Sequence, residues 1–106
     1  MDYNYFLKFA AEKDIDETFE YISNELLNID AAKNLADNLE MKFEDLTKTP
    51  KMGRIVDNPF LRREDVRLVH VDNYLVYYIV DEKSKSVVIL RVVFSGRNQD
   101  KILKEM

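Results

Sequence analysis

The sequence contains no cysteine, which excludes disulfide bonds, thiolate metal sites and cysteine nucleophiles. It has two glycines and two prolines among 106 residues, too few for long flexible linkers. The longest apolar run, Tyr74 to Val80, is far too short to cross a bilayer, so we expect no membrane association. The first residues also lack the basic start and apolar stretch of a signal peptide. Together with the missing cysteine, this predicts a cytoplasmic protein.

Histidine is almost as scarce, because His70 is the single example. A lone histidine cannot build a metal site, and no cysteine is present to help it, so we expect no metal. No glycine-rich phosphate loop, nucleophile elbow or zinc signature occurs, and we therefore expect no cofactor. We interpret His70 as a half-exposed strand residue rather than a general base.

Charge is abundant but unevenly distributed along what we expect to be one domain, residues 1–106. Residues 1–50 hold five lysines against twelve acidic residues, whereas residues 51–106 hold eleven basic against eight acidic residues. All six arginines lie in the second half. This division predicts two surfaces with different partners, although solvated charge without a partner explains it equally well.

Hydrophobic periodicity in the first half predicts a strand followed by two helices. In residues 3–9 aromatic and aliphatic side chains take the odd positions and polar side chains most of the even ones, as in a half-buried strand. From Ala11 the spacing becomes helical and continues to about Asn28. Asp30 is the expected N-cap of a second helix, which Thr49-Pro50 ends. That helix carries a regular apolar stripe, which comprises Ala32, Leu35, Leu39, Phe43 and Leu46. The short connection makes the two helices an antiparallel hairpin.

The second half predicts three consecutive strands, at residues 66–71, 74–80 and 87–94. Asp72-Asn73 is a two-residue turn, and residues 50–65 show no clear period. Residues 98–105 add a short helix with Ile102 and Leu103 facing inward. The fold class is therefore α+β, in the order β-α-α-β-β-β(-α), with the helix hairpin packed on one face of a mainly antiparallel sheet.

Several segments, in this order and with these gaps, resemble the RelE/ParE superfamily of toxins from type II toxin–antitoxin systems. They are Asp14-Ile15, Phe19 to Ile22, Asp30 to Ala32, Thr49 to Gly53, Val66 to Val69, Asn73 to Asp81, Ile89 to Val92 and Gly96 to Asn98. The resemblance covers nearly the whole chain and implies the same fold, with a curved sheet. It also implies growth inhibition, a cognate antitoxin as partner, contact with operator DNA only through that antitoxin, and a role of the plasmid-stabilisation type.

The resemblance leaves two targets open. ParE-like members inhibit DNA gyrase without chemistry of their own, whereas RelE-like members are metal-independent endoribonucleases that cleave mRNA on the ribosome. Positions where nucleases of the family carry an arginine, a histidine or a tyrosine hold Leu75, Phe94 and Leu103 here. We therefore favour gyrase slightly, and the strongly acidic hairpin supports this choice. A relic that binds antitoxin without toxicity is a third possibility.

The candidate site residues follow from the nuclease alternative. If the protein is RelE-like, Arg67, Arg91 and Arg97 are the expected catalytic cations. Arg67 and Arg91 lie on strands that flank the central one, and they form a basic patch if they face the same side; the alternative is separate surface arginines. Two adjacent tyrosines, Tyr77 and Tyr78, are expected to divide between core and surface.

Overall fold

The computed structural model describes residues 2–106 and has the predicted α+β architecture. Its first half comprises β1 (Asn4–Leu7), α1 (Phe9–Glu20), a short π-helix η1 (Tyr21–Glu25) and α2 (Ile29–Lys48). Its second half comprises β2 (Arg54–Ile55), β3 (Arg67–Val71), β4 (Tyr74–Asp81), β5 (Ser86–Phe94) and α3 (Gln99–Lys104). The prediction missed β2 because two residues are too few to show a period.

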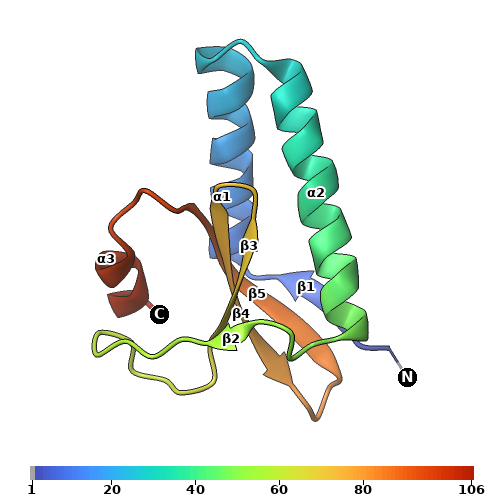
Figure 1. The fold of residues 1–106 in the computed structure, drawn as a ribbon, viewed down its shortest axis with the longest axis vertical. Coiled ribbons are helices and arrows are strands. Elements are labelled where there is room, and N and C mark those ends of the chain that lie inside the picture. The colour runs from blue at the N-terminus through green and yellow to red at the C-terminus, as the bar shows by residue number, and fades with distance from the viewer. Residues whose placement is uncertain (1) are drawn as a thin grey trace.

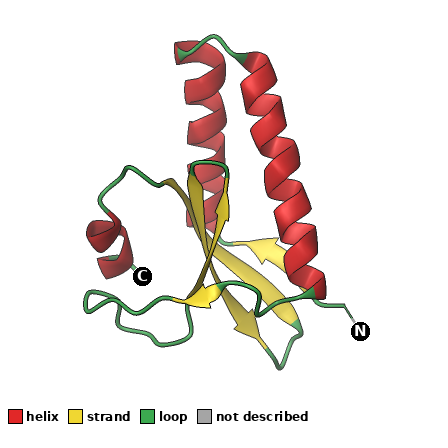
Figure 2. Ribbon diagram, in the orientation of Figure 1, coloured by secondary structure: helices red, strands yellow, loops and turns green. Residues whose placement is uncertain are grey.

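The five strands form one sheet in the order β1-β5-β4-β3-β2 (Figure 2). Strand β1 is parallel to β5, and the other three pairings are antiparallel, so the predicted mainly antiparallel sheet is confirmed. The pairing of β1 ends where Leu7 meets Ile89. Beyond Ile89, the edge of β5 therefore has no strand partner on that side, and this gap becomes important for the site.

The helix hairpin covers one face of the sheet and extends beyond it (Figure 1). The stripe predicted for the second helix is confirmed, because all five of its residues are buried. With residues of α1 and of β3, β4 and β5, among them Tyr78, they form what we call the hairpin core. Burial of large aliphatic side chains contributes about 1.5–3 kcal/mol each, so this stripe holds α2 on the sheet.

The opposite face of the sheet is covered by the segment 56–66 and by α3. These pack into a second group, the outer core, which comprises Val56, Leu61, Val66, Leu68, Leu75, Tyr77, Val93, Ile102 and Leu103. The inward position of Ile102 and Leu103 is thus confirmed. The prediction that one of Tyr77 and Tyr78 lies at the surface is wrong, since both are buried, one in each core. The sheet is covered on both faces here, so both alternating positions are internal.

Two local signals, the turn after β3 and the cap of α2, have different outcomes. The Asp72-Asn73 turn is confirmed, and Asp72 adopts a positive φ of 53°. The N-cap of α2 is Asn28 rather than Asp30, because the Asn28 side chain accepts a hydrogen bond from the Ala31 amide at 3.0 Å. Asp30 instead lies in the first turn, where its charge still suits the helix dipole.

The two helices are joined at a tight tip. After η1 the chain turns at Leu27, which has a φ of 51°. Leu27 follows the last helical turn, and the Asn28 amide donates back to the carbonyl of Ile22 at 3.1 Å. Glycine or asparagine normally occupies such a left-handed position, and a side chain with a Cβ costs about 1–2 kcal/mol there. The tip therefore contains local strain at a bulky residue.

Candidate functional site

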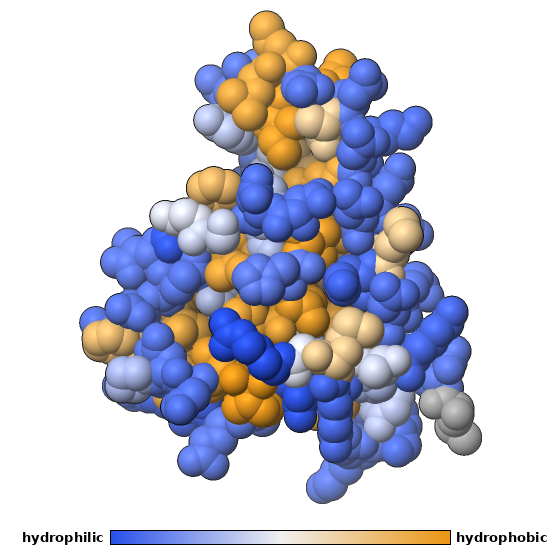
Figure 3. Space-filling model, viewed as in Figure 1, coloured by the Kyte–Doolittle hydropathy of each residue, from blue (hydrophilic) through white to orange (hydrophobic). Residues whose placement is uncertain are grey.

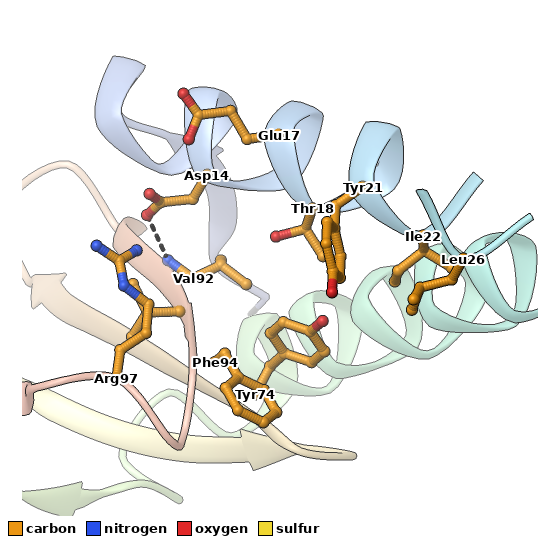
Figure 4. Close-up of a pocket in the computed structure, with 11 residues that line it drawn as sticks. Asp14, Glu17, Thr18, Tyr21, Ile22, Leu26, Tyr74, Val92, Phe94 and Arg97 are labelled. Atoms are coloured by element: carbon orange, nitrogen blue, oxygen red, sulfur yellow. Dashed lines mark hydrogen bonds between the residues drawn. The ribbon is translucent and has the colours of Figure 1, made fainter. Parts of the chain in front are cut away.

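A groove of about 560 Å³ runs between α1 and the ends of β4 and β5 (Figure 4). Its lining comprises Asp14, Glu17, Thr18, Tyr21, Ile22, Leu26, Tyr74, Val92, Val93, Phe94 and Arg97. We call it the α1 groove. Its two ends differ in chemistry: Asp14 and Arg97 lie at one end, and Tyr21, Ile22 and Leu26 lie at the other (Figure 4). The groove is thus charged at one end and apolar at the other.

Asp14 sits at the charged end because α1 presents it to the sheet. It is three residues after the buried Ala11 and four before Thr18, so it lies on the inward face of the helix and is 8% exposed. Its Oδ2 accepts a hydrogen bond from the amide of Val92 at 3.0 Å (Figure 4). This amide belongs to the edge of β5 beyond the end of β1. The carboxylate therefore accepts the hydrogen bond that a backbone carbonyl of a neighbouring strand would otherwise accept.

Arg91, on β5, is the charged partner of Asp14. Its Nε lies 2.7 Å from Oδ2 of Asp14 and its Nη2 lies 2.9 Å from Oδ1, which makes a two-pronged pair. Its Nη1 also lies 3.5 Å from Oε2 of Glu105, just after α3. The hydrogen bond to Asp14 raises the pKa of the Arg91 guanidinium. The pair joins α1, β5 and the C-terminal residues, so the charge of Arg91 already has its partners.

Arg67 is occupied at a different place. Its Nη1 donates to the carbonyl oxygen of Gly53 at 2.7 Å and to that of Lys51 at 3.2 Å. The neighbouring Tyr78 hydroxyl donates to the Pro50 carbonyl at 2.7 Å and accepts from the Gly53 amide at 2.9 Å. Burial raises the pKa of Tyr78, which keeps this hydroxyl protonated at neutral pH. Arg67 and Tyr78 therefore fasten the chain segment that follows α2.

Arg97 is the arginine that faces the groove. It follows β5 in a turn, where Gln99 Nε2 donates to its carbonyl oxygen at 2.9 Å. Its side chain extends toward the Asp14 end of the groove (Figure 4). Within residues 2–106 it takes part in no ion pair of 4 Å or less. Its guanidinium is therefore available to an incoming partner.

The three predicted arginines are not brought together. Arg67 pairs across the sheet with Tyr78, which lies in the hairpin core, whereas Arg91 pairs with Tyr77 of the outer core. Directly paired residues share a face, so these two arginines face opposite sides. A bulge in β5 between the Tyr77 and Tyr78 pairings produces this difference. The condition for a shared basic patch is not met.

The remaining predicted features have ordinary surroundings. His70 is exposed on β3, as expected. The Tyr77 hydroxyl donates to Gln99 Oε1 at 2.7 Å. In the described part of the chain, no three residues among histidine, cysteine, aspartate and glutamate could hold a metal ion together. No helix of residues 2–106 is long and apolar enough to cross a membrane.

The apolar end of the groove contains a pair of packed aromatic rings. The rings of Tyr74 and Phe94 meet edge to face with centroids 5.8 Å apart. Burial raises the pKa of Tyr74, so its ring stays neutral. Tyr21 and Leu26 of the hairpin face this pair across the groove (Figure 4). Such an apolar strip, with charges at one end, matches the side of an amphipathic helix.

Asp14 was not among the candidate site residues taken from the sequence, although its side chain is buried. A signal was present: residues 11, 14, 18 and 22 form one helical stripe, and Asp14 is its charged member. A charge on a buried stripe needs a partner, and the second half of the chain supplies the arginines.

Comparison with known proteins gives a consistent result. The model of the family described as the ParE toxin of the type II toxin–antitoxin system parDE matches residues 5–99. The fold is similar to that of a chain in the chromosomal ParDE system of P. aeruginosa, with a TM-score of 0.68 and 17% identity over 87% of this chain and 95% of that one.

Two further solved structures are similar. A mutant of the E. coli toxin RelE in the free state has a TM-score of 0.67 at 13% identity, over 99% of this chain and 96% of that one. A chain of the RelBE2 toxin–antitoxin complex from Mycobacterium tuberculosis has a TM-score of 0.62 at 21% identity, over 89% and 99%. At these identities the structures establish the fold. No curated protein matches the sequence.

Proposed function

This chain belongs to the ParE family of toxins from type II toxin–antitoxin systems, and from that premise we propose that it inhibits DNA gyrase by binding and is neutralised in the cytoplasm by a cognate antitoxin. The observation that supports binding rather than catalysis is the Asp14–Arg91 pair. Metal-independent RNA cleavage needs cations beside the scissile phosphate and groups that move protons. Arg91 is instead bound to a buried carboxylate, and Arg67 to two carbonyl oxygens.

Arg97 separates the two activities experimentally. It is the predicted cation whose side chain is available, so a nuclease of this family would depend on it. For a binding inhibitor of gyrase, we expect Arg97→Ala to retain toxicity. Lys101→Ala, a change of another exposed cation near the C-terminus, is the matched control.

The deciding experiment is pulse-labelling of DNA and protein synthesis after induction of the wild-type chain. We expect DNA synthesis to stop first, with a DNA-damage response, while translation continues. Rapid arrest of translation with cleaved transcripts, abolished by Arg97→Ala, would show the RelE-like endoribonuclease instead. Normal growth with antitoxin binding intact would identify the non-toxic relic.

We further propose that the α1 groove receives the antitoxin, as an amphipathic segment whose apolar side lies on Tyr21, Tyr74 and Phe94. The same segment would place an acidic residue beside Arg97. Contact with operator DNA would then belong to the antitoxin alone. Phe94→Ser tests this: it opens the apolar end of the groove, and we expect antitoxin affinity to fall about tenfold, since central aromatic contacts dominate such interfaces.

A further inference from the structure

The end of the helix hairpin carries apolar side chains that contribute little to either core. Leu26, Leu27 and Ile29 are 56%, 82% and 72% exposed, and we call these three residues the hairpin tip. The hairpin projects well beyond the sheet, so the tip is the part of the hairpin farthest from it (Figure 1). In the space-filling view, hydrophobic residues gather at this end (Figure 3). An apolar cluster on a projecting end is accessible to a partner protein.

The backbone of the tip has an unfavourable conformation at Leu27, and no buried contact compensates for it. Leu27 holds the left-handed position that ends the helix, where glycine or asparagine would be free of strain. It is also the most exposed large apolar side chain of the described residues. A bulky residue in this left-handed, exposed position costs stability and gains no packing in return. Such outliers point to function rather than to packing.

The charges around the tip restrict what can bind there. From Asp14 to Ala32 the sequence has six acidic residues and no lysine, arginine or histidine. Two of them, Glu25 and Asp30, are exposed and directly flank the tip in the sequence, and they form an acidic rim. This rim repels nucleic-acid phosphates, anionic lipids and the tip of a second copy. It attracts a protein surface that carries lysine and arginine.

We propose that the hairpin tip is the surface by which this toxin holds its target, and that it inserts into an apolar pocket rimmed by basic residues. This rests on the proposed function, because an enzyme that handles DNA carries basic surfaces for its phosphates. The tip and the α1 groove are then overlapping sites for target and antitoxin, because Leu26 belongs to both.

Leu27→Asn is the sharpest test, since asparagine tolerates the left-handed backbone and removes the apolar side chain. The variant should melt at or above the wild-type temperature and bind antitoxin with wild-type affinity. Inhibition of supercoiling by purified DNA gyrase should require at least about tenfold more protein, the loss that follows from one central apolar contact. The control is Met41→Gln, which removes an apolar side chain of similar exposure from α2; it should inhibit as the wild type does.

A second variant tests the charge. Glu25→Lys should slow association with gyrase and reduce its dependence on salt, because rim charges act mainly on the association rate. If Leu27→Asn inhibits gyrase as strongly as the wild type, the tip proposal is overturned while gyrase remains the target. If the wild type leaves gyrase active but arrests translation, the proposed function fails. Loss of that arrest in Leu27→Asn would then still support the tip, and its retention would overturn it.

Discussion

Removal of the Asp14 carboxylate is the perturbation that tests the structural reasoning most directly. Asp14→Ala deletes both hydrogen bonds to Arg91 and the one from the Val92 amide. The arginine then keeps its longer contact with Glu105 and some water, because its side chain is 16% exposed. The Val92 amide loses its acceptor, since β1 pairs with β5 only as far as Ile89. All of these hydrogen bonds connect α1 to the edge residues of β5, so the variant weakens the contact between the helix and the sheet.

The magnitude follows from those contacts. Breaking a buried ion pair by removing one partner costs about 3–5 kcal/mol, and partial exposure of Arg91 places this site at the low end. A buried amide without an acceptor costs about 1–3 kcal/mol. Because the terms overlap, we expect a total of about 3–4 kcal/mol. At about 4 °C per kcal/mol for a domain of this size, Tm should fall by about 12–16 °C. Asp14→Asn keeps an acceptor for Val92 and should cost about half as much.

Thermal and urea denaturation of the two Asp14 variants measures these costs, with Glu17→Ala as the control. Glu17 is exposed on the next turn of α1, so its removal should change stability by less than about 0.5 kcal/mol. The Arg91→Met variant completes a double-mutant cycle, in which the combined loss should be smaller than the sum of the single losses by about 1 kcal/mol or more. Additive losses, or an Asp14→Ala variant as stable as the control, would refute the assigned role.

Three further predictions concern the segment after α2 and the hairpin. Burial raises the pKa of Tyr78 above its ordinary value of 10.0, so the folded protein holds this proton more tightly than the unfolded chain does. The free energy of unfolding should therefore not depend on Tyr78 below about pH 10, and it should fall as pH rises through the folded-state pKa. Urea midpoints between pH 8 and pH 12 check this, and Tyr78→Phe should flatten the alkaline decline. Gly53→Ala would place a Cβ 2.6 Å from the Tyr78 hydroxyl and 2.8 Å from the Leu68 carbonyl, and we expect a loss of about 1–3 kcal/mol in chemical denaturation, where a loss below 0.5 kcal/mol would contradict the close approach. Asn28→Ala removes the N-cap of α2 and should cost about 1 kcal/mol, whereas Asp30→Ala, the cap expected from the sequence, should cost less than half of that.

The elements of this fold were predictable because burial leaves a period in the sequence. The stripe on α2 is regular, and each of its residues is buried. The β3–β4 turn was equally readable, because aspartate and asparagine adopt positive φ with little strain. Both signals are local, and each needs no knowledge of the rest of the chain. The family resemblance, which depends on the order of such segments, is confirmed for the same reason.

The directions of the arginines were not predictable. Regular alternation along β5 would place Ile89 and Arg91 on the same face of the sheet. A bulge adds one residue to β5 between them, and Arg91 therefore points to the opposite face. The partner of Arg91 lies 77 residues earlier in the chain. A pattern within one strand carries no information on either fact. The sequence therefore pointed to these arginines and left open whether they bind a partner or the protein itself.

On the two proposals made above, Leu26 is the residue at which antitoxin and target compete. Leu26 lines the apolar end of the α1 groove and also belongs to the hairpin tip. A segment seated in the groove therefore covers one flank of the surface that enters the target's pocket. Neutralisation then needs no change in the toxin's conformation, because the two occupants compete for the same side chain. Leu26→Ser should therefore lower the affinity for both antitoxin and target, whereas Leu27→Asn should lower the affinity for the target alone. Measuring both affinities for both variants distinguishes a shared contact from conformational coupling.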